Sequence, residues 1–147
     1  YEPYAATSAP NQRRSTPYRY PGTVPFGDAE AHWDAQRLAD YLQQPMTWAR
    51  AHGIAANRMV VAEFGCMRRW PDCPAYLRDV LSVLGREQVH WAFYAFREDG
   101  WDGMDYELGD RPLPMAYWEA QAKGLAPEPP RRDTALFRLI GNALNAP

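Results

Sequence analysis

The chain has 147 residues, the length of one domain, and its 46% hydrophobic and 23% charged residues are ordinary for a globular protein. Sixteen basic and 18 acidic residues give a net charge of −2, and positive charge is not clustered, so nucleic acid is not an expected partner. No apolar run approaches the ~20 residues that a membrane-spanning helix needs, so no membrane partner is expected.

The first part of the chain predicts a long ordered loop followed by two helices. Residues 1–27 contain five prolines and no sustained hydrophobic period, which argues against a helix. Asp28 is a suitable N-cap for a helix over residues 28–43, which Pro45 is expected to break. A second helix is predicted over residues 45–52, ending at the glycine that follows.

The middle of the chain alternates strands and helices. Residues 58–64 are mostly apolar and rich in valine, which is typical of a strand buried on both faces of a parallel sheet. A helix with an apolar stripe is predicted over residues 74–84, ending at Gly85, and residues 89–96 predict a second strand. This order indicates an α/β fold with parallel strands. Two strands alone would leave hydrophobic edges exposed, so we expect further strands to complete the sheet.

The last third of the chain predicts a long loop over residues 97–132 and a helix over residues 133–145. Four apolar side chains are expected to be buried by this helix: Leu136, Leu139, Ile140 and Leu144. The loop contains an acidic cluster, Asp99, Asp102, Asp105 and Glu107. Because they lack the EF-hand pattern, we expect them to make hydrogen bonds and turns rather than to bind calcium.

Cys66 and Cys73 are the two cysteines of the chain, with six residues between them. This spacing can close a small disulfide loop, with two unpaired thiols as the alternative, whereas a zinc site would need further ligands. We expect the disulfide. Because disulfides persist in oxidising compartments, we also expect a secreted or periplasmic protein.

Glu63 is the candidate catalytic residue, because it follows the apolar residues 59–62 at the end of a predicted strand. Catalytic groups of alternating strand–helix barrels lie at this end of their strands. A carboxylate there is costly to bury without a partner. A salt bridge to Arg68 or Arg69, or a capping contact, is the structural alternative.

Aromatic residues are abundant, with six Trp and nine Tyr. Their flat rings suit the apolar faces of sugars, and Trp101 in the long loop is a candidate sugar platform. The alternative is that some of these rings only cover loops.

Two segments resemble glycoside hydrolase family 5, the cellulase-type (β/α)8 barrels. Residues 61–65, VAEFG, are similar to the strand-seven signature of that family, in which the Glu before Phe-Gly is the nucleophile. Residues 90–96, HWAFYAF, are similar to strand eight. The resemblance implies that Glu63 is the nucleophile and that Tyr94 is the aromatic platform beneath the sugar, a position where the family more often has Trp.

A third segment, YEPY at residues 1–4, looks like the stretch after strand six and implies that Tyr1 hydrogen-bonds the nucleophile. Together the resemblance implies that residues 1–147 are the C-terminal part of one TIM-barrel catalytic domain, from the end of strand six to helix eight. The family's acid/base Glu follows an Asn, and no Asn-Glu pair occurs here. We therefore expect a missing N-terminal segment or a second chain to complete the barrel, and the chain alone to be poorly soluble and inactive.

The implied activity is retaining hydrolysis of β-1,4-linked glucan, as in an endoglucanase, and it needs no cofactor or metal. In such a double displacement one carboxylate attacks the anomeric carbon, while a second carboxyl group, about 5–5.5 Å away, protonates the leaving oxygen. The alternatives are a β-mannanase or a β-glucosidase of the same family. A different class also remains open, a barrel remnant that binds sugar or a protein without catalysis.

Overall fold

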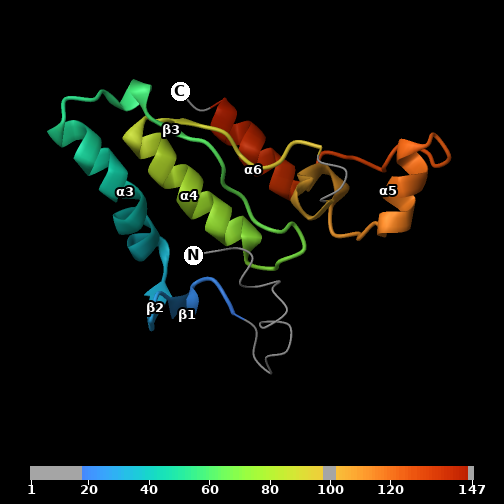
Figure 1. Cartoon of the computed structure of the whole chain (residues 1–147), viewed down its shortest axis with the longest axis horizontal. Helices are drawn as coiled ribbons and strands as arrows, with labels where there is room; N and C mark the ends of the chain where they lie inside the picture. Colours follow the sequence, from blue (N-terminus) through green and yellow to red (C-terminus); the bar gives the residue numbers. More distant parts are fainter. Residues whose placement is uncertain (1–17, 98–101, 146–147) are drawn as a thin grey trace.

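The structure, a computed structural model, describes residues 18–97 and 102–145 (Figure 1). Within these ranges the strands form one antiparallel pair and one parallel pair. The strands are β1 (Gly22–Phe26), β2 (Ala29–Trp33), β3 (Val60–Val61) and β4 (His90–Trp91). The α-helices are α3 (Ala35–Ala51), α4 (Cys73–Glu87), α5 (Met115–Ala122) and α6 (Ala135–Leu144), and 3-10 turns cover Ala56–Arg58, Asp102–Met104 and Tyr106–Leu108.

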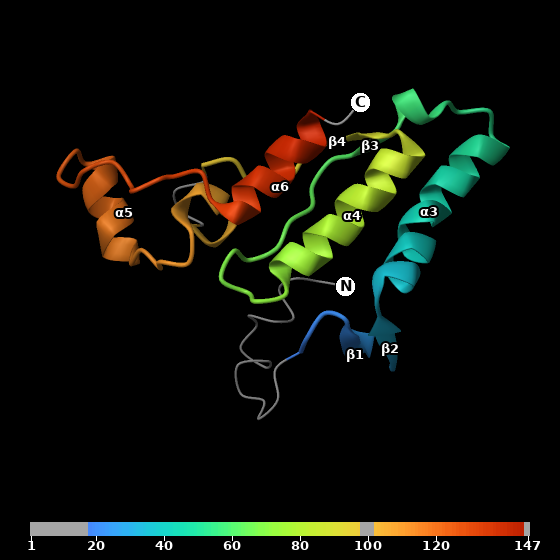
Figure 2. The same cartoon turned by 180° about the vertical axis from the view of Figure 1, so that it is seen from behind.

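Three helices form the main layer of the described chain. α3, α4 and α6 lie side by side with α4 in the middle, and both views show this arrangement (Figures 1 and 2). α5 stands apart from this layer at one end of the molecule. The fully buried core includes Trp33, Leu77, Leu84 and Ile140, which come from β2, α4 and α6. Packing of α4 against both neighbouring helices therefore holds the layer together.

The hairpin of β1 and β2 occupies a segment where loop and helix were predicted. Gly27 and Asp28 form its two-residue connection, and Gly27 has φ +62°, the conformation that such turns require at their first position. The prediction that Asp28 caps a helix is therefore wrong. Asp34 is the N-cap instead, and its side chain accepts a 2.8 Å hydrogen bond from the backbone N–H of Arg37.

α3 is continuous, so the predicted break at Pro45 is wrong. Proline removes one intrahelical hydrogen bond, but its ring is exposed here, while Met46 and Ala49 are buried against the core. Packing of the buried face thus outweighs the missing bond. The predicted end of the helix is confirmed, because the chain passes through His52 into Gly53, whose φ is +68°.

β3 and β4 are parallel, as predicted, but shorter than the predicted segments 58–64 and 89–96. The prediction that the first of them is buried on both faces is wrong, since Val60 is 62% exposed. Val89, just before β4, is buried. The described part of the chain thus covers only one side of this strand pair.

α4 confirms the predicted helix over residues 74–84 and extends it to Glu87. Its buried apolar stripe contains Leu77, Val80 and Leu84. Gly85 lies inside the helix, so the prediction that it ends the helix is wrong. Gln88 ends it in the left-handed conformation, with φ 52°.

The segment predicted as loop over residues 97–132 contains α5, which the sequence did not reveal. With only eight residues, this helix has too few turns to show a clear period. Within α5, only Trp118 is buried. Its indole N–H has no hydrogen-bond partner in the described structure.

α6 confirms the predicted last helix, with Thr134 as its N-cap. Ile140 is 1% exposed and anchors the helix against α4, whereas Leu136 and Leu139 are half-buried. Leu144, which was expected to be buried, is 66% exposed. The helix therefore buries only the middle of its apolar face.

The order α3, β3, α4, β4, α6 alternates helices with two parallel strands. That these elements belong to a (β/α)8 barrel stays a prediction, and so does the single-domain assignment of residues 1–147. Of the helices in the described ranges, none combines the length and apolar character needed to cross a bilayer.

The burial of Ile140 gives a direct test of this packing. We expect Ile140→Ala to lower the free energy of unfolding by about 2–5 kcal/mol, because it leaves a cavity between α6 and α4. Leu144→Ala is the matched control, and it should change stability by less than about 0.5 kcal/mol because Leu144 is exposed. Urea denaturation measures both, and equal losses in the two variants would contradict the described packing.

Candidate functional site

Parallel pairing brings the ends of β3 and β4 together around Glu63. The backbone N–H of Ala92 donates to the carbonyl of Val61 (2.9 Å), and that of Tyr94 donates to the carbonyl of Phe64 (2.8 Å). The two donors are two residues apart, whereas the two acceptors are three residues apart. The β3 side therefore carries one extra residue, a bulge of the kind that redirects side chains at sheet ends. Glu63 lies in this bulge.

The Glu63 side chain is exposed at this position. Within the described ranges its carboxylate makes no hydrogen bond or ion pair, so neither a salt bridge to Arg68 or Arg69 nor a capping contact is observed there. Arg68 is 5% exposed, and its guanidinium donates to the carbonyl oxygens of Gly109 and Arg111 instead, the second at 2.7 Å. The carboxylate of Glu63 is thus accessible to a ligand.

The backbone just after Glu63 is held tightly against β4. A Cβ at Gly65 would overlap the carbonyl oxygen of Tyr94 and would lie 2.6 Å from the terminal methyl of Met104. Only glycine fits this contact without a shift of the surrounding atoms. Gly65 therefore fixes the distance between the two strand ends.

The next residue, Cys66, is held in two ways. Its N–H donates to the hydroxyl of Tyr106 at 2.9 Å, and its sulfur forms the predicted disulfide with Cys73, the first residue of α4. Tyr106 is 2% exposed and stacks on Phe93 at 5.7 Å between ring centroids. Burial raises the pKa of Tyr106 above its usual value, so the hydroxyl stays protonated. These contacts anchor the loop that follows Glu63 to α4 and to the β4 side.

Tyr94 follows β4 and is half-buried. Its backbone is the donor to Phe64 described above, and its peptide bond to Ala95 is cis. Phe64 in turn packs edge-on against Trp91, with 5.7 Å between centroids. The structure therefore brings Tyr94 and Glu63 to the same end of the strand pair. The other two predicted site residues, Tyr1 and Trp101, lie outside the described residues.

Two members of the acidic loop cluster serve in the hydrogen bonds and turns that we expected. Asp105, 1% exposed, accepts from the N–H of Glu107 (3.1 Å) and from Arg131 (2.8 Å). Glu107 accepts from both Nε and a terminal nitrogen of Arg97, at 2.6 and 3.1 Å. The hydrogen bond from Arg97 holds the pKa of Glu107 below its usual value. Asp99 lies outside the described residues, and among those described no group of acidic, His or Cys side chains is arranged to hold a metal ion.

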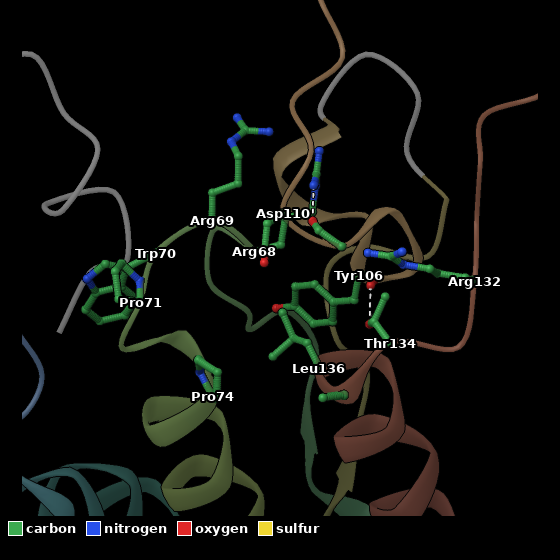
Figure 3. A pocket seen from close by; sticks show the side chains of 12 residues that line it. Arg68, Arg69, Trp70, Pro71, Pro74, Tyr106, Asp110, Arg132, Thr134 and Leu136 are labelled. Atoms are coloured by element: carbon green, nitrogen blue, oxygen red, sulfur yellow. Dashed lines mark hydrogen bonds between the residues drawn. The ribbon is translucent and has the colours of Figure 1, made fainter.

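Sequence reasoning missed Arg68 and Tyr106 as the residues that support the site. Each acts across about forty residues of chain, and no local pattern marks such contacts. A cavity of about 620 Å³ lies beyond them, lined by Arg68, Tyr106 and the first residues of α6, and neither Glu63 nor Tyr94 lines it (Figure 3).

A scan against protein-family models finds no match to this chain, and a search of curated proteins finds no significant similarity.

Gly65 can be tested by adding a single methyl group. We expect Gly65→Ala to lower the free energy of unfolding by about 1–3 kcal/mol, because its Cβ has no space beside Tyr94. Gly85→Ala is the control: it has no atom within 4 Å of the new Cβ and should be neutral or stabilise α4 by up to about 1 kcal/mol. Thermal and urea denaturation measure both, and a stable Gly65→Ala protein would rule out the close contact.

The ion pair of Glu107 predicts a pH dependence of stability. The pKa of Glu107 is lower in the folded protein than its value of about 4.5 in the unfolded chain. The ion pair therefore stabilises the fold fully above pH 4.5, and this stabilisation is lost as the pH falls through the folded-state pKa. We expect Glu107→Gln to cost about 1 kcal/mol at neutral pH, since Arg97 is half exposed and solvent screens the pair. The loss of stability caused by Glu107→Gln should become smaller at low pH, where Glu107 of the unaltered protein is itself protonated.

Urea midpoints measured from about pH 7 down to about pH 3 give this difference. Glu119→Gln, at an exposed position of α5, is the matched control and should show no pH-dependent effect. A Glu107→Gln cost that is the same at both ends of the pH range would contradict the ion pair as its source.

Proposed function

We propose that this chain supplies the nucleophile of a retaining glycoside hydrolase that cleaves β-1,4-linked glucan. The observation that carries the proposal is the exposed carboxylate of Glu63 in a bulge at the end of β3, beside the end of β4. An exposed carboxylate on a backbone held in place at Gly65 has two properties that a nucleophile needs, access to substrate and a fixed point of attachment.

Tyr94 is proposed as the stacking platform for the sugar at the cleavage point. Its backbone N–H donates to Phe64, the residue after Glu63, so the backbones that carry the ring and the carboxylate are joined directly. A tyrosine ring presents an apolar face to the C–H groups of a sugar, and its hydroxyl can still meet water. Tyr1 is proposed to hydrogen-bond Glu63 and Trp101 to add a second platform.

The reaction proceeds in two displacements. Glu63 attacks the anomeric carbon, the bond to the leaving oxygen breaks, and a carboxylic acid on the other side protonates that oxygen. The same second group then takes a proton from water, whose oxygen bonds to the anomeric carbon while the ester bond to Glu63 breaks, which releases the sugar with net retention. The sequence has no Asn-Glu pair to match the family's acid/base residue, so the proposal assigns this role to a segment outside the sequence.

The open edges of the parallel pair support this assignment. In the described ranges β3 pairs with β4 alone, and Val60 is 62% exposed. Parallel sheets are normally covered on both faces, and exposed strand edges invite pairing. We therefore propose that an N-terminal segment of the same barrel, in the same polypeptide or as a separate chain, completes the (β/α)8 fold around these strands. The Cys66–Cys73 disulfide supports a secreted or periplasmic location.

The nucleophile assignment is tested with Glu63→Gln in the protein with its completing segment. We expect kcat on an aryl cellobioside to fall on the order of 10³-fold or more, with an unchanged unfolding midpoint, because the amide cannot form the glycosyl ester. Glu30→Gln, an exposed position on β2, is the matched control and should keep full activity. Near-normal activity of Glu63→Gln would show that Glu63 is not the nucleophile.

The substrate is tested with a panel of β-glucan, mannan and short aryl glucosides. The proposal expects the highest kcat/KM on β-glucan, and preference for mannan or for the short glucosides would move the assignment to a mannanase or a β-glucosidase. A monodisperse, well-folded isolated chain that binds glucan without hydrolysis would favour a non-catalytic binding protein.

A further inference from the structure

A cavity of about 620 Å³ opens between the loop after β3 and the segment that leads into α6. In Figure 3, Trp70 and Pro74 lie on one side of it and Arg132 and Thr134 on the other, with Tyr106 between them. Since Glu63 does not line this cavity, the proposed hydrolysis leaves it without a role.

The charged side chains that line the cavity are three arginines and one aspartate: Arg68, Arg69, Arg132 and Asp110. Arg68 is almost fully buried, and its hydrogen bonds to two carbonyl oxygens hold its positive charge in place. Arg69, Arg132 and Asp110 are all exposed, so water screens their charges to a similar extent, and the lining still carries three positive charges against one negative. The lining therefore favours an anion.

Arg132 is the arginine best placed to contact a ligand. Its backbone N–H donates to the carbonyl of Glu107, which fixes the start of its side chain. Its guanidinium rests over Gly109, where a Cβ would lie 2.9 Å from a terminal nitrogen. Within the described part of the chain, this guanidinium makes no ion pair or hydrogen bond. Its planar fork is thus available to hold two oxygens of one anionic group.

The first turn of α6 adds a second favourable field. The Thr134 hydroxyl donates to the carbonyl of Tyr106 (2.6 Å) and accepts from the N–H of Phe137 (3.0 Å), so the cap is fixed in place. The next residues, Ala135 and Leu136, line the cavity. The N-terminus of a ten-residue helix carries partial positive charge that stabilises an anion beside it.

We propose that this cavity binds a small ligand through an oxyanion, a carboxylate or a phosphate, held by Arg132 in the field of Arg68 and of the α6 N-terminus. The apolar surfaces of Trp70, Pro74 and Leu136 receive the uncharged part of the ligand. Two sources share this chemistry, an acidic sugar and a phosphate. The proposal goes beyond the proposed hydrolysis and does not depend on it, because binding is measured without turnover.

Isothermal titration calorimetry tests it, on the same preparation that is used for the activity assays. The probes are glucuronate, glucose as its neutral counterpart, and inorganic phosphate. We expect glucuronate or phosphate to bind at low salt, to weaken in about 0.5 M salt because the contact is ionic, and glucose not to bind. Tighter binding of glucuronate than of phosphate identifies the acidic sugar as the source, and the reverse order identifies phosphate.

Arg132→Gln should weaken anion binding at least about tenfold, the loss expected for a charge-assisted hydrogen-bonded pair. Arg58→Gln removes the same charge at an exposed site beside β3, away from the cavity, and should bind like the unaltered protein. If circular dichroism shows that Arg132→Gln is unfolded, Arg132→Lys replaces it, and it should also weaken anion binding because lysine keeps the charge but lacks the planar guanidinium that holds two oxygens. Binding of neither anion, equal binding of glucose, or unchanged affinity in the folded variant would overturn the proposal.

Discussion

The contact between the backbones of Gly65 and Tyr94 sets the geometry on which the rest of the site depends. A side chain at Gly65 would overlap the carbonyl oxygen of Tyr94, so the two chain segments approach as closely as backbones can. The hydrogen bond from Tyr94 to Phe64 forms at the same place, and the extra residue on the β3 side accommodates it. Glu63 is the residue that this arrangement turns outward.

Contacts from three directions keep that backbone in place. Tyr106 holds the N–H of Cys66, the disulfide ties Cys66 to the start of α4, and Arg68 fastens the loop to the carbonyl oxygens of Gly109 and Arg111. All three are buried or nearly so, where water competes poorly for hydrogen bonds. The rigid support and the exposed carboxylate at its centre are the physical basis for proposing a nucleophile at Glu63.

Local sequence patterns predicted the elements that depend on short-range chemistry. The parallel strands followed from apolar composition and the order of elements, the stripe of α4 and the last helix from helical periodicity, and the Cys66–Cys73 bridge was expected from the cysteine spacing. The sequence was misleading where long-range packing outweighs local preference, as in α3, which runs through Pro45 because its opposite face is buried. The β1–β2 hairpin was missed because Gly27-Asp28 also reads as a loop followed by a helix cap. Tyr106 and Arg68 could not be predicted, since their partners lie about forty residues away.

The central claim is that Glu63 becomes covalently bound to the sugar, and trapping that bond tests it most directly. A cellobioside with fluorine in place of the C2 hydroxyl and a dinitrophenolate leaving group should react once and then stay attached. Fluorine slows release, and this leaving group departs without an acid. Digestion and mass spectrometry of the protein with its completing segment should then place one fluorocellobiosyl group on Glu63. An adduct on any other residue, or none in a preparation that hydrolyses β-glucan, would contradict the account.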